Sequence, residues 1–220
     1  MSAIKEFLTA KITRKKLDDF IYKYRDSDKV VLDLGCGDGN YKDLFPKRIG
    51  FDHRPGINVD VVGDAHQLPF EDGKFDIILC TEILEHLHSP QIAIKEMERV
   101  LKPGGLLLLT TRFVFPLHDV PNDYYRYTKY GLRFLLKDGW DILEFEAESS
   151  TKDTIAILLQ RIGFQTNMIG GPIAKLFLFL AVKAVIFSPS LIKKEYGDIR
   201  HSRIEENIMT SGYHLAAKKI

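Results

Sequence analysis

The sequence has little cysteine and almost no net charge, and both shortages exclude classes of protein. Two cysteines among 220 residues, Cys36 and Cys80, cannot build a disulfide framework, so we expect a reducing compartment. A formal net charge of +1 gives no overall attraction to nucleic acid, which we therefore do not expect as a partner. The first residues contain no apolar signal-peptide core, which predicts a cytoplasmic protein.

Apolar residues are plentiful, and their spacing predicts alternating strands and helices. They make up 45% of the chain, enough for the core of one α/β domain with an insertion. This alternation predicts parallel βαβ units in a doubly wound sheet. In the first half, strands are expected over 30–34, 48–52, 58–62, 75–80 and 105–111, and helices over 3–24, 39–45 and 90–101.

The second half adds two strands separated by a long insertion. A helix over 128–137 and a strand over 141–148 precede the insertion, and a last strand over 212–218 follows it. Helices are expected inside it over 151–162 and 172–187, which would make it a lid or a partner surface. The predicted division is a single domain with an N-terminal helix (1–28), a core (29–149), a helical insertion (150–210) and a last strand (211–220).

The most apolar segment of the chain is 168–187. A helix over 172–187 would be about 24 Å long, shorter than the roughly 30 Å that a membrane span needs. Lys175 and Lys183 would lie about 80° apart on it and therefore share a side. This pattern suits a helix in the interface of the inner membrane surface, with its lysines reaching the headgroups. It equally suits a helix buried against the domain or a dimer partner, and both interpretations stay open.

A glycine loop directly follows the first expected strand. Segment 30–40 reads Val-Val-Leu-Asp-Leu-Gly-Cys-Gly-Asp-Gly-Asn, in which Gly35, Gly37 and Gly39 let the backbone approach a nucleotide-like ligand. The third glycine comes one residue earlier than in the dinucleotide fingerprint. The carboxylate of Asp33 would also repel a pyrophosphate. An acid at this position suits a ligand that carries an amino group.

Five motifs together resemble the class I S-adenosyl-L-methionine (SAM) methyltransferases. The glycine loop resembles motif I of that family, and the segments 49–52, 63–70, 75–87 and 99–111 resemble its later motifs in the same order. The type 11 subgroup is the nearest match. The resemblance implies a Rossmann-like fold with a seven-stranded, mostly parallel sheet, an antiparallel last strand and a helical insertion before it. It also implies SAM as the cofactor and methyl transfer as the activity.

The resemblance further implies how the cofactor is held. Asp33 would lie near the methionine amino group, Asp52 would accept hydrogen bonds from the ribose hydroxyls, and Asp64 would accept one from the adenine amino group. Ala65 would supply a backbone donor, and Thr81 would line the same cleft. The expected cofactor-binding set is Asp33, Gly35, Cys36, Gly37, Gly39, Asp52, His53, Asp64, Ala65 and Thr81.

The segment 111–128 follows the fifth strand and is dense in His, Asp, Tyr and Arg, which suits recognition of a polar substrate. His118 is the candidate general base, because a hydroxyl is a poor nucleophile until its proton is removed, and Asp119 or Asp123 could orient it. A purely structural histidine is the alternative. The run over 123–128 resembles type 11 proteins of cell-surface polysaccharide or glycolipid pathways. We therefore expect O-methylation of a sugar, glycolipid or other cell-envelope small molecule, which includes lipid-linked acceptors.

A second pattern raises the question of a metal. Glu82, Glu85 and His86 form a Glu-x-x-Glu-His motif that resembles the metal site of small-RNA 2′-O-methyltransferases and of some ubiquinone-pathway O-methyltransferases. His118 would complete a set suited to Mg²⁺, Mn²⁺ or Zn²⁺. Because Leu-Glu-His is widespread in type 11 proteins with no known metal, the main prediction is a site without one. Metal-assisted methylation of a quinone-type ring or an RNA 2′-hydroxyl, and SAM binding without catalysis, remain alternatives.

Overall fold

The computed structural model describes residues 2–14, 16–39 and 41–220, and the chain divides into two compact units. The sheet unit comprises Lys16–Phe113, Leu117–Glu146 and Tyr213–Ile220. The hairpin unit comprises Met1–Lys15, Val114–Pro116 and Ala147–Gly212. The division into parts of a single domain stays a prediction.

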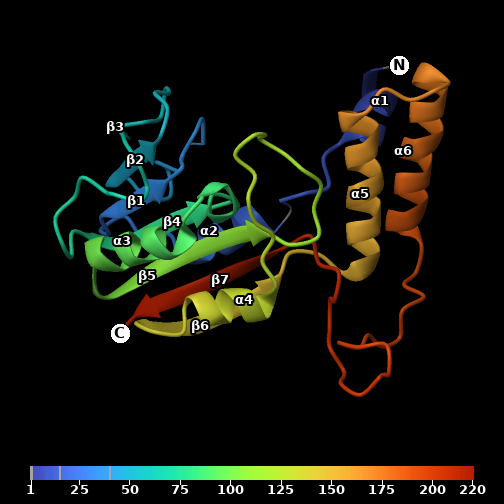
Figure 1. Cartoon of the computed structure of the whole chain (residues 1–220). Coiled ribbons are helices and arrows are strands. Elements are labelled where there is room, and N and C mark those ends of the chain that lie inside the picture. Colours follow the sequence, from blue (N-terminus) through green and yellow to red (C-terminus); the bar gives the residue numbers. More distant parts are fainter. Residues whose placement is uncertain (1, 15, 40) are drawn as a thin grey trace. The chain divides into compact units, whose positions relative to one another are not determined.

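The sheet unit is built around a sheet with the strand order β3-β2-β1-β4-β5-β7-β6 (Figure 1). β1 pairs in parallel with β2 and β4, and β4 pairs in parallel with β5, whereas β7 runs opposite to β5 in Figure 1. The predicted seven-stranded, mostly parallel sheet with an antiparallel last strand is confirmed. The strands are β1 (Val31–Leu34), β2 (Arg48–Asp52), β3 (Val61–Val62), β4 (Phe75–Thr81), β5 (Leu101–Arg112), β6 (Trp140–Ala147) and β7 (Gly212–Lys219).

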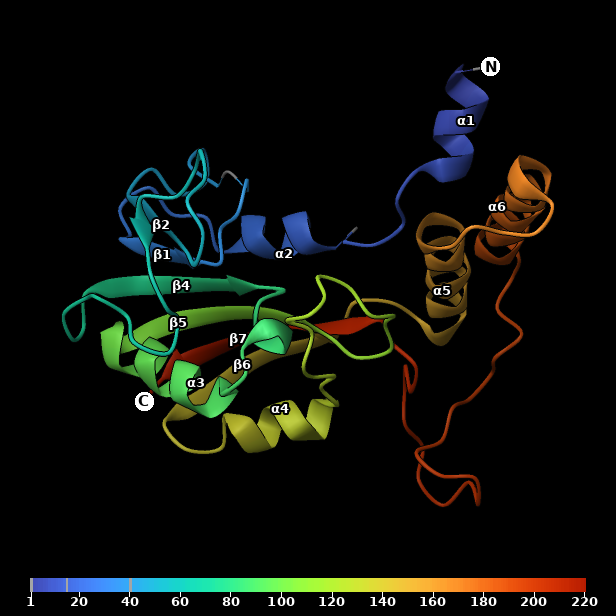
Figure 2. The ribbon, with the colours of Figure 1, turned by 45° about the horizontal axis from the view of Figure 1, so that its top comes forward.

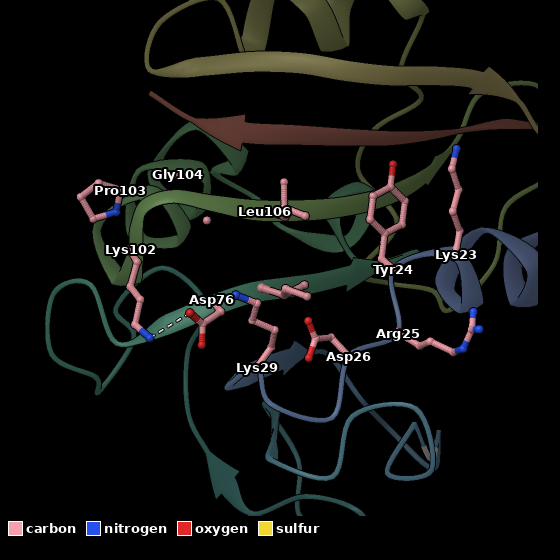
Figure 3. Close-up of a pocket in the computed structure, with 12 residues that line it drawn as sticks. Lys23, Tyr24, Arg25, Asp26, Lys29, Asp76, Lys102, Pro103, Gly104 and Leu106 are labelled. Carbon is pink, nitrogen blue, oxygen red and sulfur yellow. Dashed lines mark hydrogen bonds and ion pairs between the residues drawn. The ribbon is translucent and has the colours of Figure 1, made fainter.

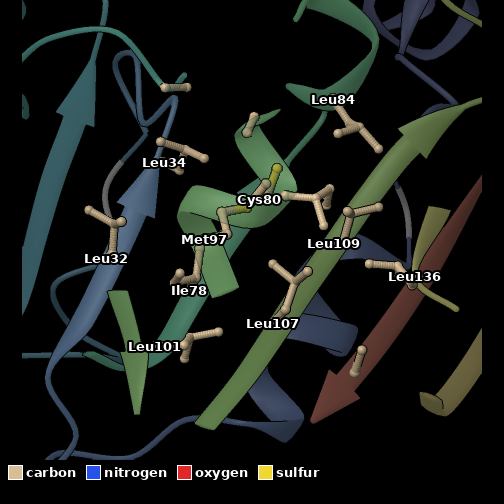
Figure 4. Close-up of a cluster of buried hydrophobic side chains, with 14 of the residues drawn as sticks. Leu32, Leu34, Ile78, Cys80, Leu84, Met97, Leu101, Leu107, Leu109 and Leu136 are labelled. Carbon is tan, nitrogen blue, oxygen red and sulfur yellow. The ribbon is translucent and has the colours of Figure 1, made fainter. Parts of the chain in front are cut away.

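Apolar side chains cover both faces of this sheet, because successive residues of a strand point to opposite sides. In β5, Leu107 and Leu109 lie in one buried cluster with Met97 of α3, as Figure 4 shows. Leu108 between them belongs to the second cluster, with Phe20 of α2. Burial on both faces explains the near-continuous apolar runs in the sequence. The helices of this unit are α2 (Leu17–Lys23), the short 3₁₀ helix η1 (Leu84–His86), α3 (Pro90–Val100) and α4 (Lys129–Leu135).

The hairpin unit contains α1 (Ser2–Thr9), α5 (Thr151–Gln165) and α6 (Gly171–Phe187). Helices α5 and α6 lie side by side in both Figure 1 and Figure 2. Ser150 caps α5, since its hydroxyl oxygen accepts a hydrogen bond from the Asp153 amide at 3.1 Å. Across the described ranges, every helix is too short or too polar to cross a membrane.

The single helix predicted over 3–24 is wrong, because the segment 10–14 between α1 and α2 is not helical. A side chain binds two of its backbone groups: the Gln160 amide nitrogen donates to the Ala10 carbonyl, and the Gln160 amide oxygen accepts from the Ile12 amide. Residue 15 of this prediction lies outside the described residues. The apolar spacing correctly predicted helical structure in α1 and in α2, but it could not show that these two helices belong to different units.

The helix predicted over 39–45 is also wrong. Residues 41–45 form one turn, in which the Phe45 amide donates to the Tyr41 carbonyl at 2.9 Å. Pro46 follows at once, and it cannot continue a helix because it lacks an amide hydrogen. Residue 40 lies outside the part of the chain that the structure describes.

The strand predicted over 58–62 shortens to the two residues Val61 and Val62 of β3. The Asn58 carbonyl is not available for strand pairing, because it accepts hydrogen bonds from the Arg48 guanidinium. Apart from an earlier start of β5 at Leu101, the other predicted helices and strands begin and end within three residues of their observed bounds.

Candidate functional site

The glycine loop lies at the carboxyl ends of β1 and β2, where open α/β sheets bind ligands. The amides of Gly35 and Cys36 both donate to the Phe51 carbonyl, at 2.7 and 3.1 Å. The Gly37 amide donates to Oδ2 of Asp52 at 3.0 Å. These bonds fix the loop against the end of β2 and bring the predicted residues Gly35, Cys36, Gly37 and Asp52 together.

Gly35 occupies a position that no other residue fits. Its φ is +69°, in the left-handed region that disfavours side chains, and a Cβ there would lie 2.1 Å from Cδ1 of Ile83. Ile83 lies just before η1, so the glycine lets the loop after β1 approach the turn after β4. A side chain at position 35 would force these two strand ends apart.

Asp33 is buried below the loop in an ion pair that the sequence reasoning missed. Nε of Arg48 donates to Oδ2 of Asp33 at 2.7 Å, and the two side chains are 0% and 1% exposed. Burial raises the pKa of Asp33, although the hydrogen bond and charge of Arg48 oppose the shift. Gly50 makes room for the arginine, because a Cβ there would lie 2.8 Å from both Nη atoms. The available signal was an arginine at the start of an expected buried strand, which requires a buried acid as partner.

One oxygen of Asp33 remains for a ligand. Within the described residues, Oδ1 of Asp33 is buried and has no hydrogen-bond partner, while Oδ2 binds Arg48. Buried polar atoms are normally hydrogen-bonded, so an unpartnered carboxylate oxygen beside a glycine loop indicates a binding group.

The remaining cofactor candidates lie along the same edge of the sheet. Asp52 ends β2, and its Oδ1 accepts from the Arg54 amide at 3.1 Å and lies 3.0 Å from Nδ1 of His53. Thr81 ends β4 and is buried. Both residues therefore lie at the carboxyl ends of strands on either side of β1.

Asp64 and Ala65 follow β3. Oδ1 of Asp64 accepts from the backbone amide of His66 at 2.9 Å and lies 2.6 Å from its Nδ1. Hydrogen bonds from the amide and then the ring of His66 lower the pKa of Asp64. The Asp64 side chain is exposed and ionised, whereas Ala65 is buried.

The part of the loop after β5 that belongs to the sheet unit, 117–128, is held on η1. The amides of Tyr124 and Tyr125 donate to the Glu85 carbonyl at 3.0 and 3.2 Å. Nδ1 of His86 donates to the Asn122 carbonyl at 2.6 Å. The loop that the sequence singled out is therefore packed against the Glu-x-x-Glu-His turn.

His118 is oriented by Asp123 rather than by Asp119. The His118 amide donates to Oδ2 of Asp123 at 2.9 Å, and its ring Nδ1 lies 3.4 Å from the same oxygen. Burial by itself would raise the pKa of Asp123. Two nitrogens of the Arg126 guanidinium bind the two carboxylate oxygens at 2.6 Å. Together with the hydrogen bond from the His118 amide, this contact lowers the pKa of Asp123 to about 2. Asp119 instead places its Oδ2 3.9 Å from Nε2 of His86.

Glu85, His86 and His118 form a cluster whose potential ligand atoms all lie within 4.8 Å of one another. Glu85 is fully buried, and its Oε2 accepts from the Thr111 hydroxyl at 2.7 Å. Its Oε1 has no hydrogen-bond partner among the described residues and lies 3.9 Å from Nε2 of His118. Burial raises the pKa of Glu85. The fourth residue of the predicted metal set, Glu82, pairs with Arg112 and is not in this cluster.

A pocket of about 420 Å³ lies at the opposite ends of the strands (Figure 3). It is lined by Lys23, Arg25 and Lys29 before β1 and by the starts of β4 and β5. Nζ of Lys102 binds Oδ1 of Asp76 there at 2.9 Å. Because this pocket opens at the amino ends of the strands and contains no candidate site residue, it is separate from the edge built by the glycine loop.

Comparison with known proteins gives a family match over most of the chain. A family model described as a methyltransferase domain matches residues 5–167. This range contains every cofactor and catalytic candidate named from the sequence.

Curated relatives match over shorter stretches and act in different ways. A ubiquinone/menaquinone biosynthesis C-methyltransferase from Shewanella halifaxensis is 36% identical over 132 residues, 53% of this chain and 51% of that protein. A malonyl-[acyl-carrier protein] O-methyltransferase from Herminiimonas arsenicoxydans is 33% identical over 109 residues, 43% and 41% of the two chains. A tRNA U34 carboxymethyltransferase from Nautilia profundicola is 34% identical over 107 residues, which are 40% of this chain and 35% of that protein. The chain thus spans about half or less of the curated relatives it matches.

Solved structures show the same fold. The crystal structure of the [4+2]-cyclase SpnF superposes with a TM-score of 0.58 at 21% identity, and the match covers 93% of this chain and 80% of that one. At this identity the likeness concerns the fold alone.

Proposed function

The chain belongs to the class I SAM-dependent methyltransferase family, and we propose that it transfers the methyl group of SAM to an oxygen atom of a small-molecule acceptor. The observation that carries the proposal is the pairing of His118 with Asp123 on the loop after β5, at the same edge of the sheet as the glycine loop. The family match does not separate subgroups, so membership of type 11 stays a prediction.

The residues at the sheet edge fit SAM. SAM carries a cationic ammonium and a cationic sulfonium, and the edge offers buried carboxylates at Asp33 and Asp52. Oδ1 of Asp33, which lacks a partner in the described part of the chain, suits the ammonium, directly or through water. Asp52 ends β2, where an acid suits ribose hydroxyls. When bound, SAM supplies an electrophilic methyl group.

We assign to His118 the role of the general base, which removes the proton from the acceptor hydroxyl. Asp123 on its Nδ1 side favours the tautomer with hydrogen on Nδ1, which leaves the Nε2 lone pair to accept a proton. Once protonated, the imidazolium would lie between the carboxylates of Asp123 and Glu85, and both would stabilise its charge. Asp119 has no part in this assignment, because it lies beside His86.

The acceptor we propose is a hydroxylated ring, such as a sugar or the sugar of a glycolipid. Three tyrosines on the loop support it: the ring centroid of Tyr125 is 6.4 Å from that of Tyr124 and 5.8 Å from that of Tyr127. Aromatic rings offer apolar faces with polar edges, which suits such a ligand. Because one relative is a tRNA carboxymethyltransferase, an RNA acceptor stays an alternative.

Metal-assisted methylation is the second candidate, and one observation favours it. The Nδ1 atoms of His86 and His118 face the Asn122 carbonyl and the Asp123 carboxylate, so both Nε2 atoms can carry a lone pair. Together with Oε1 of Glu85, they make a three-ligand set oriented by its neighbours, as metal-binding histidines usually are. A divalent ion held there would acidify an acceptor hydroxyl.

Calorimetric titration with SAM, followed by measurement of S-adenosylhomocysteine release from a panel of sugar, glycolipid and quinol acceptors, tests the proposal. His118→Gln should lower turnover far more than it lowers SAM affinity, whereas the control His201→Gln, in the hairpin unit, should change neither. Absence of SAM binding would refute the cofactor assignment, and equal loss of turnover and affinity would refute the base assignment. Turnover that a chelator abolishes and Mn²⁺ restores would select the metal-assisted reaction.

A further inference from the structure

Helix α6 of the hairpin unit exposes a continuous apolar face. Phe179 and Val182 are buried on the side that packs in the hairpin, where the Phe179 ring lies 5.4 Å from that of Phe164. The other side is exposed, and Ile173, Phe177 and Phe187 are 67%, 66% and 72% accessible. At about 100° per residue, six of the exposed residues share an arc of roughly 100°, and the exposed Pro172 and Ala181 lie about 40° beyond its two edges. This arc, called the α6 face, consists of Ile173, Leu176, Phe177, Leu180, Ala184 and Phe187.

No charged residue interrupts the α6 face. Lys175 and Lys183, the charged residues of this helix, lie outside the arc and are half-buried. Nζ of Lys183 lies 4.4 Å from the centroid of the Phe7 ring of α1. The α6 face itself is therefore entirely apolar, and Lys183 lies about 20° beyond its Leu176 edge, from where a long side chain can keep its charge away from an apolar environment.

The hairpin unit is basic, although the whole chain is nearly neutral. It contains twelve Lys and Arg against seven Asp and Glu, a formal charge of +5, which leaves −4 on the sheet unit. Directly after α6, Leu191 is 95% exposed beside the exposed Lys193 and Lys194. An apolar residue next to two cations matches the depth profile of a bilayer, whose headgroups lie just above its acyl chains.

We propose that the hairpin unit docks on an anionic lipid bilayer, with α6 lying in the interface and the α6 face directed toward the acyl chains. A helix of 17 residues is about 25 Å long, too short to span a bilayer but sufficient to lie along it. Charge argues against a second copy as the occupant, because it would bring two units of +5 together, whereas anionic headgroups complement that charge. Docking does not depend on methyl transfer, and it would hold the chain at a surface that carries lipid-linked acceptors.

Co-sedimentation of the full chain with vesicles tests the docking. Vesicles of phosphatidylcholine mixed with phosphatidylglycerol should bind the protein, and vesicles of phosphatidylcholine alone should bind it much less. Phe177→Ser with Leu180→Ser should lower binding by about tenfold or more, since two apolar side chains would no longer be buried in lipid. The matched control is Phe134→Ser with Leu143→Ser in the sheet unit, where the exposures are similar at 71% and 53%. This control should bind like the wild type.

A second variant tests how much positive charge contributes to vesicle binding. Lys193→Glu with Lys194→Glu changes two exposed residues outside the helix, so it should fold even if the serine variant does not, and it should lower binding to anionic vesicles by about tenfold or more. Unchanged binding by this variant, or no vesicle binding by the wild type, would overturn the proposal. A wild-type dimer that the serine variant dissociates, without vesicle binding, would assign the α6 face to a second copy instead. SAM affinity should stay unchanged in both variants, so failure of docking and failure of the methyltransferase assignment are distinguishable.

Discussion

Replacing Arg48 with methionine should lower the free energy of unfolding by about 3–5 kcal/mol, the usual cost of removing one partner from a buried ion pair. The Arg48 side chain is 0% exposed, and it donates to Oδ2 of Asp33 and twice to the Asn58 carbonyl. Methionine would fill much of the space, but it would leave the Asp33 carboxylate buried without a cation. Since domains are typically stable by about 5–15 kcal/mol, this variant should fold only marginally.

The pH dependence of this loss identifies its cause. Burial already raises the pKa of Asp33, and Arg48 limits the shift, so Arg48→Met should raise the pKa further. A carboxyl group with a raised folded-state pKa binds more protons in the folded protein than in the unfolded protein. The stability of the variant should therefore fall as pH rises from the ordinary Asp value through the raised folded-state pKa. The defect should be smaller at mildly acidic pH than at neutral pH.

Urea unfolding followed by fluorescence measures the effect, because Trp140 is the single tryptophan and is buried. Lys47→Met is the neighbouring control: its ion pair with Asp28 is exposed and 3.9 Å long, so its loss should cost less than about 1 kcal/mol. Adding Asp33→Leu to Arg48→Met should restore most of the stability, but it should abolish SAM binding, because it removes the carboxylate assigned to the SAM ammonium. A loss below about 1 kcal/mol in Arg48→Met, independent of pH, would refute the claim that the pair is desolvated.

Two further predictions concern the carboxylates of the proposed site. Asp52→Ala should weaken SAM binding by about 1–3 kcal/mol, the scale of hydrogen bonds to a charged group, and unchanged affinity by calorimetry would mean that the ribose is held elsewhere. The pKa of Asp123 is lowered from 3.8 to about 2, and its side chain is 1% exposed. Its ionised form therefore stabilises the folded state fully above about pH 4. About 2 kcal/mol should be lost as pH falls from about 4 to 2, and acid titration of Asp123→Asn should lack this loss.

The sequence was sufficient where one pattern determines one element. The apolar run of β4 and the Pro90 start of α3 fixed both elements almost to the residue. Gly35, Gly37 and Asp52, which the sequence named as cofactor candidates, lie at one edge of the sheet, because the carboxyl ends of adjacent parallel strands are neighbours.

The sequence was insufficient where distant residues decide the local structure. Nothing local to 10–14 shows that the Gln160 side chain will bind its backbone and end α1. Similarly, Asp119 and Asp123 are both within five residues of His118, and only the folded loop shows that Asp123 is the one beside the ring. The Arg48–Asp33 pair joins two adjacent strands, so it depends on their register, which composition does not contain.

The two carboxylates on either side of His118 are driven to opposite pKa shifts, and this difference supports the roles assigned to them. Asp123 is held ionised by Arg126, so it can fix hydrogen on Nδ1 of His118 at any pH in the physiological range. Glu85 is buried and its pKa is raised, so its carboxyl group loses its proton most readily when a cation lies beside it. Nε2 of His118, 3.9 Å from Oε1 of Glu85, is the point where such a cation would form or bind. A proton from an acceptor hydroxyl and a divalent ion would therefore be stabilised by the same geometry, because both place positive charge between Glu85 and His118.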